Sequence, residues 1–149
     1  MKLRIGDKAP DFELQATGGK TFRLGSELNG GRLVLYFYPK DFTPGCTAEA
    51  CGFRDEFSEL RRSEARVLGV SVDSIESHEK FKKEYQLPFD LLSDVDGKVS
   101  HLYGVYNRLF KIANRVTFIV DSDGKILNIT KNMFAPQVHV RAAKSVPAQ

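Results

Sequence analysis

The most informative stretch of this 149-residue sequence reads Tyr38-Pro39-Lys40-Asp41-Phe42-Thr43-Pro44-Gly45-Cys46-Thr47-Ala48-Glu49-Ala50-Cys51. It continues the apolar run 33–38, which is typical of a strand buried on both faces, and Pro39 prevents that strand from continuing. Thr43 before Pro44 favours a helix that begins here, with threonine as the N-cap and proline as the first helical residue. The stretch therefore predicts a buried strand, a short loop and a helix whose first turn carries Cys46.

The position of Cys46 in that first turn favours a thiolate. Unpaired backbone N–H groups and the positive end of the helix dipole stabilise an anion there. An ordinary thiol has a pKa of about 8.5, and lowering it to about 6 takes roughly 3.4 kcal/mol. A helix terminus contributes only about 0.3–1 kcal/mol. The site therefore needs a further cation, and a buried arginine would also stabilise negative charge on a leaving oxygen.

The second cysteine, Cys51, lies five residues after Cys46. On a regular helix this spacing separates the two Cα atoms by roughly 8–9 Å, whereas a disulfide needs about 4.4–6.8 Å. The two thiols therefore cannot bond while the helix is intact. Any redox reaction between them requires its first turns to unwind.

The remaining segments alternate between strand and helix patterns. Strand patterns occupy residues 12–14, 21–24, 67–72, 116–120 and 125–130. The first two flank the turn 17–20 and predict an N-terminal hairpin. Those that predict helices are 43–60, 75–85 with Ser74 as its cap, 95–103 and, weakly, 136–143. This order favours an α/β fold with helices on both faces of a central sheet.

Composition excludes several classes of protein. A length of 149 residues, 42% of them hydrophobic, suits one domain, so we expect 1–149 to form a single unit. The net charge of +3 comes without a basic cluster, and no apolar stretch approaches the roughly 18 residues of a membrane span. We therefore expect neither nucleic-acid nor membrane binding. Two cysteines are too few for a disulfide scaffold or a structural zinc site.

The spacing Pro39-x-x-x-Thr43-x-x-Cys46 matches the active-site signature of peroxiredoxins. The extension C-x4-C to Cys51 resembles the peroxiredoxin Q group, also called bacterioferritin comigratory protein. Within that group the chain is most similar to the plant-plastid and cyanobacterial branch. Other segments that carry the resemblance are 6–12, 87–94, 103–110, 115–121 and 132–136. Residues 137–149 match poorly, so the C-terminal tail lies outside it.

The resemblance implies a thioredoxin-like fold and an atypical two-cysteine peroxiredoxin, which reduces hydrogen peroxide and organic hydroperoxides. Cys46 would be the peroxidatic cysteine that becomes a sulfenic acid. Cys51 would be the resolving cysteine that condenses with it to an intramolecular disulfide. A thioredoxin or similar dithiol would then restore both thiols by exchange.

The resemblance also assigns the neighbouring residues. Thr43 and Arg115 would orient the thiolate and the peroxide, and Pro39 would shield the sulfur and shape the pocket. Glu49 would hold the arginine through an ion pair, although a glutamate near a helix start is also favoured by the dipole alone.

No metal, haem or flavin is implied. The three histidines, His78, His101 and His139, are scattered without metal-ligand spacing, and we interpret them as non-catalytic. The resemblance favours a monomer that serves antioxidant defence in a bacterial cytoplasm, or in a plastid if the chain is a mature plant form.

Two other functions remain open from the residues alone. A thioredoxin-like protein disulfide reductase would normally carry C-x-x-C, which is absent here. A non-enzymatic redox sensor would use the Cys46–Cys51 pair to alter a partner surface. The rate of peroxide consumption separates both from a peroxidase.

Overall fold

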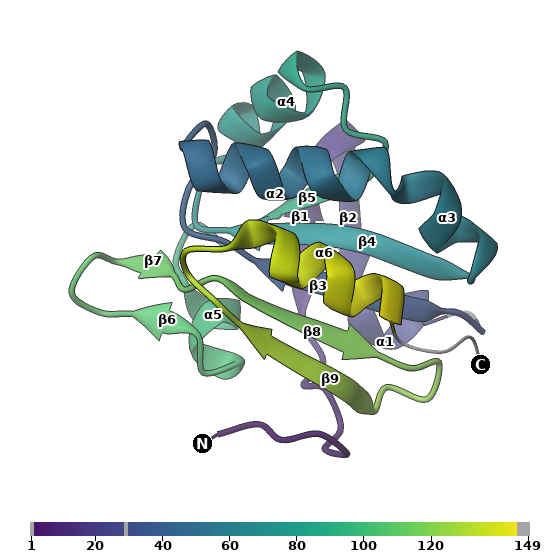
Figure 1. Ribbon diagram of the computed structural model, residues 1–149. Coiled ribbons are helices and arrows are strands. Elements are labelled where there is room, and N and C mark those ends of the chain that lie inside the picture. Colours follow the sequence, from purple (N-terminus) through teal and green to yellow (C-terminus); the bar gives the residue numbers. More distant parts are fainter. Residues whose placement is uncertain (1, 29, 146–149) are drawn as a thin grey trace.

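A mixed seven-stranded sheet runs through the computed structural model, which describes residues 2–28 and 30–145. Its strands are β1 (Glu13–Ala16), β2 (Lys20–Arg23), β3 (Arg32–Phe37), β4 (Ala65–Ser71), β5 (Asp90–Ser93), β8 (Val116–Val120) and β9 (Ile126–Lys131). They lie in the order β2-β1-β5-β4-β3-β8-β9. Strands β3, β4 and β5 are parallel, and the other pairings are antiparallel. A separate small hairpin, visible in Figure 1, is formed by β6 (Tyr106–Asn107) and β7 (Ile112–Ala113).

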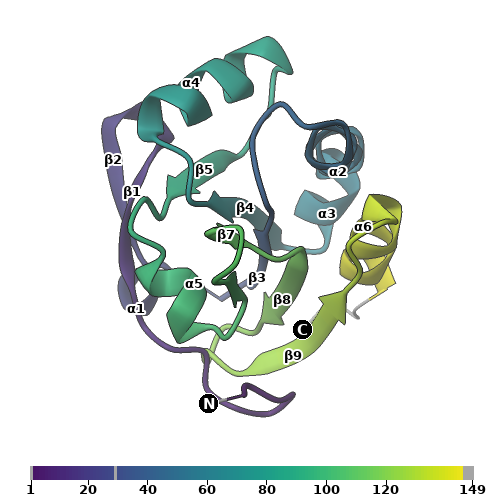
Figure 2. The ribbon, with the colours of Figure 1, turned by 90° about the vertical axis from the view of Figure 1, so that its left-hand side faces the viewer.

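Helices cover both faces of this sheet, as the sequence predicts. They are α1 (Leu24–Glu27), α2 (Pro44–Asp55), α3 (Phe57–Arg62), α4 (Ile75–Glu84), α5 (Lys98–Leu102) and α6 (Pro136–Ser145), with a 3₁₀ turn η1 (Thr17–Gly19). Helices α2, α3 and α6 lie together on one side, and α5 lies on the other (Figure 2). This arrangement confirms the expected thioredoxin-like α/β architecture with a central mixed sheet.

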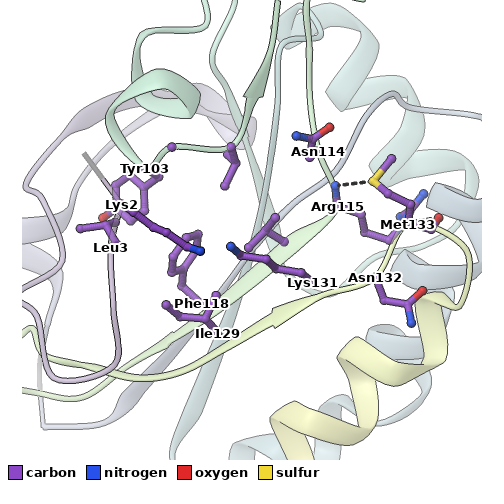
Figure 3. Close-up of a pocket in the computed structure, with 13 residues that line it drawn as sticks. Lys2, Leu3, Tyr103, Asn114, Arg115, Phe118, Ile129, Lys131, Asn132 and Met133 are labelled. Carbon is purple, nitrogen blue, oxygen red and sulfur yellow. Dashed lines mark hydrogen bonds between the residues drawn. The ribbon is translucent and has the colours of Figure 1, made fainter.

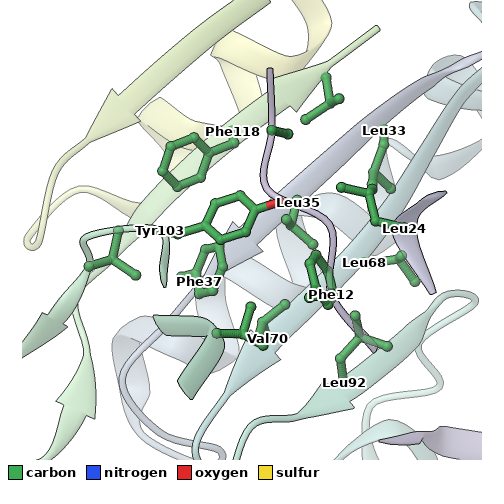
Figure 4. Packing of buried hydrophobic residues seen from close by; sticks show 14 of the residues in the cluster. Phe12, Leu24, Leu33, Leu35, Phe37, Leu68, Val70, Leu92, Tyr103 and Phe118 are labelled. Atoms are coloured by element: carbon green, nitrogen blue, oxygen red, sulfur yellow. The ribbon is translucent and has the colours of Figure 1, made fainter. Parts of the chain in front are cut away.

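Strand β3 explains why the sheet is buried on both faces. Its side chains alternate, so Leu33, Leu35 and Phe37 enter one hydrophobic cluster while Val34 and Tyr36 enter the other. The first cluster is drawn in Figure 4. Both clusters are closed by helices or by the N-terminal segment, which is why the strand reads as a continuous apolar run.

Several elements differ from the sequence expectation. The expected N-terminal hairpin is present as β1 and β2, and β1 also pairs with β5, which joins the hairpin to the central sheet. Strand β5 itself was not predicted, since its four residues are too short for a periodic signal. The helix expected over 43–60 breaks at Glu56 into α2 and α3.

The C-terminal tail folds into a longer helix than its weak pattern predicts. Helix α6 reaches Ser145, and the expected stop at Pro147 lies outside the described residues. Its buried residues, His139, Val140 and Ala143, face the sheet and α2. No helix in the described ranges is long and apolar enough to cross a membrane.

Candidate active site

The loop between β3 and α2 places Cys46 in the first turn of the helix, as the sequence predicts. Thr43 occupies the N-cap position, and its backbone oxygen accepts the first helical hydrogen bond from Thr47 N–H at 2.9 Å. Its hydroxyl, however, donates to the Lys40 carbonyl at 2.9 Å and makes no capping bond to the helix. Cys46 is 1% exposed, so its sulfur lies at the helix start and out of bulk water.

Arg115 supplies the cation that the sequence analysis requires in addition to the helix terminus. It lies immediately before β8, whose Val116 pairs with Phe37 at the end of β3. Its Nη2 donates to the Cys46 sulfur at 3.3 Å, and its Nη1 donates to Glu49 Oε1 at 2.6 Å. The sheet therefore brings together two residues that are 69 positions apart in the sequence.

Two acidic groups compete for the charge of this arginine. Burial raises the pKa of Glu49 to about 8, although Arg115 opposes that shift. Burial also lowers the pKa of Arg115, but Glu49 and Cys46 together raise it above its ordinary value, so the guanidinium stays charged. Arg115 is therefore a charged donor that Cys46 and Glu49 share, at 3.3 Å and 2.6 Å.

The closeness of Gly45 to Arg115 gives a first prediction. A methyl group on Gly45 would stand 3.0 Å from Arg115 Nη2, so Gly45→Ala must displace the guanidinium from the sulfur. Alanine is a better helix former by about 1 kcal/mol, so stability should not fall. We expect peroxide consumption about tenfold slower, the loss that about 1.4 kcal/mol of transition-state stabilisation represents, at an unchanged or higher melting temperature.

The matched control for this variant is Gly52→Ala on the same helix. Its methyl group would meet Val140 at the same 3.0 Å, with no arginine nearby. It therefore tests crowding alone. An equal loss of rate in both variants would contradict the specific role of the Gly45 position.

Sequence reasoning missed a buried network that anchors the active-site loop. Asp41 lies within that loop, and its Oδ1 accepts from Tyr38 OH at 2.6 Å while its Oδ2 contacts His78 Nδ1 at 2.7 Å and Ser77 OH at 2.8 Å. His78 Nε2 in turn contacts the Leu92 carbonyl at 2.9 Å. No local motif indicates this network, because it joins the loop after β3 to α4 and β5 only in the folded chain.

One group of three side chains in the described part of the chain has the spacing of metal ligands: Asp41, Asp73 and His78. The sequence had not indicated it. Asp73 Oδ2 accepts from Asp41 N–H at 2.8 Å and from Ser71 OH at 2.6 Å. Since these oxygens already accept protein hydrogen bonds, the group is explained as part of the loop anchor.

The other expected site residues occupy less confined positions. Cys51 is half-buried on α2, and both cysteines are free thiols. Pro39 is half-buried in the loop that follows β3. Both cysteines belong to one continuous helix, so the separation derived from helix geometry applies.

A groove of about 720 Å³ lies near Arg115 but is not lined by Cys46. Its lining includes Arg115, Met133 and Lys131 together with Phe118 and Ile129 (Figure 3). The side chain of Phe118 belongs to the cluster opposite to that of Cys46. The groove therefore opens on the sheet face away from α2, and a hydrogen bond from Arg115 N–H to the Met133 sulfur at 3.1 Å lies at its edge.

A buried thiol at a helix start, held by an arginine on a thioredoxin-like sheet, defines the class of thiol peroxidases. The sequence agrees with this class, because residues 5–129 match the model of the AhpC/TSA family. The chain belongs to the AhpC/TSA family and, within it, to the peroxiredoxin Q/Bcp group. It is accordingly a thiol-dependent peroxidase, which acts on peroxides with a thioredoxin-type reductant.

Three comparisons illustrate the relationship. A putative peroxiredoxin bcp of Coxiella burnetii is 46% identical over 132 residues, which cover 85% of this chain and 87% of that protein. The chloroplastic peroxiredoxin Q of Oryza sativa subsp. japonica is 42% identical over 93% of this chain, which spans 64% of that longer protein. The crystal structure of peroxidoxin BcpB from Mycobacterium tuberculosis superposes with a TM-score of 0.90 at 37% identity, and the match covers 96% of this chain and 95% of that one.

Proposed function

We propose that Cys46 is the peroxidatic cysteine of this chain and that it reduces hydrogen peroxide and alkyl hydroperoxides. Its thiolate attacks the terminal peroxide oxygen, the O–O bond breaks, and the leaving hydroxide or alkoxide takes up a proton. Cys46 thereby becomes a sulfenic acid. The observation that carries this proposal is the 3.3 Å contact between Arg115 Nη2 and the Cys46 sulfur in a buried helix start.

The neighbouring residues take supporting roles in the same proposal. Arg115 stabilises the thiolate and the charge that develops on the leaving oxygen. Glu49 positions Arg115 through its 2.6 Å hydrogen bond. Thr43, at the helix start, orients the peroxide, and Pro39 shields the sulfur from water. The positions of Thr43 and Pro39 in the loop before Cys46 support these last two roles.

Stopped-flow mixing of the fully reduced chain with hydrogen peroxide tests the function. We expect consumption far faster than that by free cysteine at the same pH, because Arg115 already donates to the Cys46 sulfur and stands ready for the leaving oxygen. A rate equal to that of free thiol would leave only a disulfide reductase or a redox sensor.

Cys51 completes the proposed cycle as the resolving cysteine. Its thiolate attacks the sulfenic sulfur, the S–O bond breaks, and the leaving hydroxide takes up a proton from solvent to become water. The resulting Cys46–Cys51 disulfide is then reduced by a thioredoxin through exchange. Both cysteines lie in α2, so the helix must unwind around them before the sulfur atoms can meet.

This unwinding gives a second prediction, on hydrogen exchange. Oxidation with one equivalent of peroxide should lower the protection of backbone amides across about residues 43–55, the span of α2 and its cap. Strand β4 (Ala65–Ser71) is the internal control, because its ladder with β3 does not depend on α2. Equal exchange of the α2 amides in the two redox states would contradict the proposed disulfide.

The cellular setting is part of the same proposal. We place the chain in a bacterial cytoplasm, or in a plastid if it is a mature plant form, which the Coxiella and rice relatives support. A monomer suffices, since both cysteines and the arginine lie in one chain. Residues 1–149 would form one domain, because strands from both ends of the chain share the central sheet.

A further inference from the structure

The loop before α2 contains one residue in an unusual backbone conformation, Phe42. Its φ angle is 68°, in the left-handed region that residues other than glycine rarely adopt. Three further non-glycine residues in the described ranges share this region, and all of them lie outside the loop: Glu64, Gln86 and Lys111. A bulky residue in this conformation is strained, so the contacts around it must hold it there.

The preceding residue, Asp41, is fixed by contacts outside α2. It is 4% exposed, and its carboxylate contacts Ser77 and His78 of α4 at 2.8 Å and 2.7 Å. Its backbone N–H donates to Asp73 Oδ2 at 2.8 Å. Since none of these partners belongs to α2, Asp41 can keep its place when that helix changes shape.

The ring of Phe42 also contacts α4. It packs edge-on against Phe81, with the ring centroids 5.0 Å apart, and its centroid lies 6.4 Å from that of Tyr85. Phe81 is fully buried, whereas Phe42 is 47% exposed. The ring therefore holds Phe42 against α4, and the backbone can turn there without exposing a fully buried side chain.

Helix α2 starts directly after Phe42. Thr43 is the N-cap, and its carbonyl accepts the first helical hydrogen bond, from Thr47 N–H at 2.9 Å. The first turns of α2 must open before the sulfur atoms of Cys46 and Cys51 can meet. Phe42 thus lies between an anchored residue and the segment that has to move.

We infer that Phe42 is the hinge at which α2 unwinds, and that it is thereby a positioning residue for the reaction of the Cys46 sulfenic acid with Cys51. This inference rests on the proposed roles of the two cysteines. While the helix is intact, Phe42 is held in the left-handed region. When the first turns open, its backbone relaxes to an ordinary conformation, which offsets part of the cost of unwinding. The open form is then more populated, and the disulfide forms faster.

Alanine and glycine at this position separate the backbone strain from the ring. Phe42→Ala and Phe42→Gly both remove the ring, but only glycine adopts the left-handed region without strain. The intact helix is therefore favoured more in the glycine variant. We expect Phe42→Gly to form the disulfide about fivefold more slowly than Phe42→Ala, a factor that corresponds to about 1 kcal/mol.

Rapid quenching after one equivalent of peroxide measures the two chemical steps separately. Alkylation of the free thiols and mass spectrometry then distinguish the thiol, the sulfenic acid and the disulfide. The sulfenic acid should form equally fast in Phe42→Ala and Phe42→Gly, because Cys46 and Arg115 are unchanged. A purely structural role of Phe42 would not slow only the second step.

Lys111 offers the matched control, because its φ angle is 57° in the exposed connection between β6 and β7. Lys111→Ala and Lys111→Gly should form the disulfide at the same rate. Equal disulfide rates in the two Phe42 variants would overturn the inference. A slower first step in Phe42→Gly than in Phe42→Ala would also overturn it, because Phe42 would then act on the thiol and not on the unwinding.

Hydrogen exchange at two amides locates the hinge in the unmodified chain, without any substitution. The Asp41 N–H is bonded to Asp73 outside α2, and the Thr47 N–H is bonded to Thr43 within the helix start. In the disulfide form, the Thr47 amide should lose its protection and the Asp41 amide should keep it. Loss at both amides would place the hinge before Asp41, and protection at both would exclude unwinding from Phe42, so either result refutes the inference.

The proposed function fails through different observations. A sulfenic acid that never becomes a Cys46–Cys51 disulfide in the unmodified chain would contradict the role of Cys51. Peroxide consumption no faster than that by free cysteine would contradict the role of Cys46. Either result also removes the basis of the inference, whereas equal rates of the two Phe42 variants, in a chain that does form the disulfide, refute the hinge alone.

Discussion

Cys46→Ser is expected to abolish peroxide turnover, the largest effect that any single substitution in this chain should have. A serine hydroxyl does not ionise at neutral pH, so neither the helix start nor Arg115 can make it a nucleophile of comparable strength. The shape of the buried site changes little, because oxygen replaces sulfur without adding atoms. Steady-state consumption coupled to a thioredoxin system measures the loss, and turnover retained by this variant would contradict the assignment of Cys46.

Cys51→Ser is the companion variant that separates the two cysteines. It leaves the contact between Cys46 and Arg115 intact, because Cys51 is a half-buried residue further along α2. We expect one sulfenic acid per chain after a single addition of peroxide, detected by mass spectrometry after trapping with a dimedone probe. Continued cycling with a thioredoxin would show that another thiol resolves the sulfenic acid.

Arg115→Ala is expected to slow the reaction of Cys46 with peroxide by about 10²- to 10³-fold, the usual cost of removing one donor to developing negative charge. Two losses combine in this variant: the thiolate loses its hydrogen bond from Nη2, and the leaving oxygen loses its cation. Rapid-quench or stopped-flow measurement of the first turnover isolates this step from reduction of the disulfide. The Arg115→Ala substitution should also lower the fraction of Cys46 that iodoacetamide alkylates at neutral pH.

Two further substitutions complete the Arg115 experiment. Arg115→Lys keeps a positive charge but cannot reach Cys46 and Glu49 with a planar fork, so we expect only partial recovery. Arg141→Ala removes an exposed arginine of α6 and should leave the rate unchanged. A rate that does not change in Arg115→Ala would show that another cation stabilises the thiolate.

Local patterns predicted the strands and helices that are long or sharply bounded. The burial of β3 on both faces appears in the sequence as an unbroken apolar run, and Ser74 caps α4 through a 3.2 Å bond from Ser77 N–H. Strand β5 and the break at Glu56 were missed, because four residues carry no reliable period and helix ends depend on neighbouring packing.

The residues of the candidate site also divide into those that local sequence predicts and those that only the folded chain brings together. Cys46, Cys51 and the helix start are neighbours in the chain, so motif and helix geometry sufficed to place them. Arg115 was expected from a resemblance, and the sheet pairing that brings it to the sulfur became visible only in the structure. His78 and His139 were interpreted as non-catalytic, and the structure adds their positions: His78 contacts Asp41 in the active-site loop, and His139 lies 3.8 Å from Glu49.

The sequence by itself thus predicted the proposed nucleophile, its helix and the need for unwinding, because these depend on spacing within a few turns of one chain segment. The tertiary structure decided the electrostatics. Whether a carboxyl such as Glu49 is charged depends on desolvation and on residues from β8 and α6, which are 66 and 90 positions away along the chain. Such long-range contacts leave no local pattern in the sequence, since any spacing between the two residues is compatible with them.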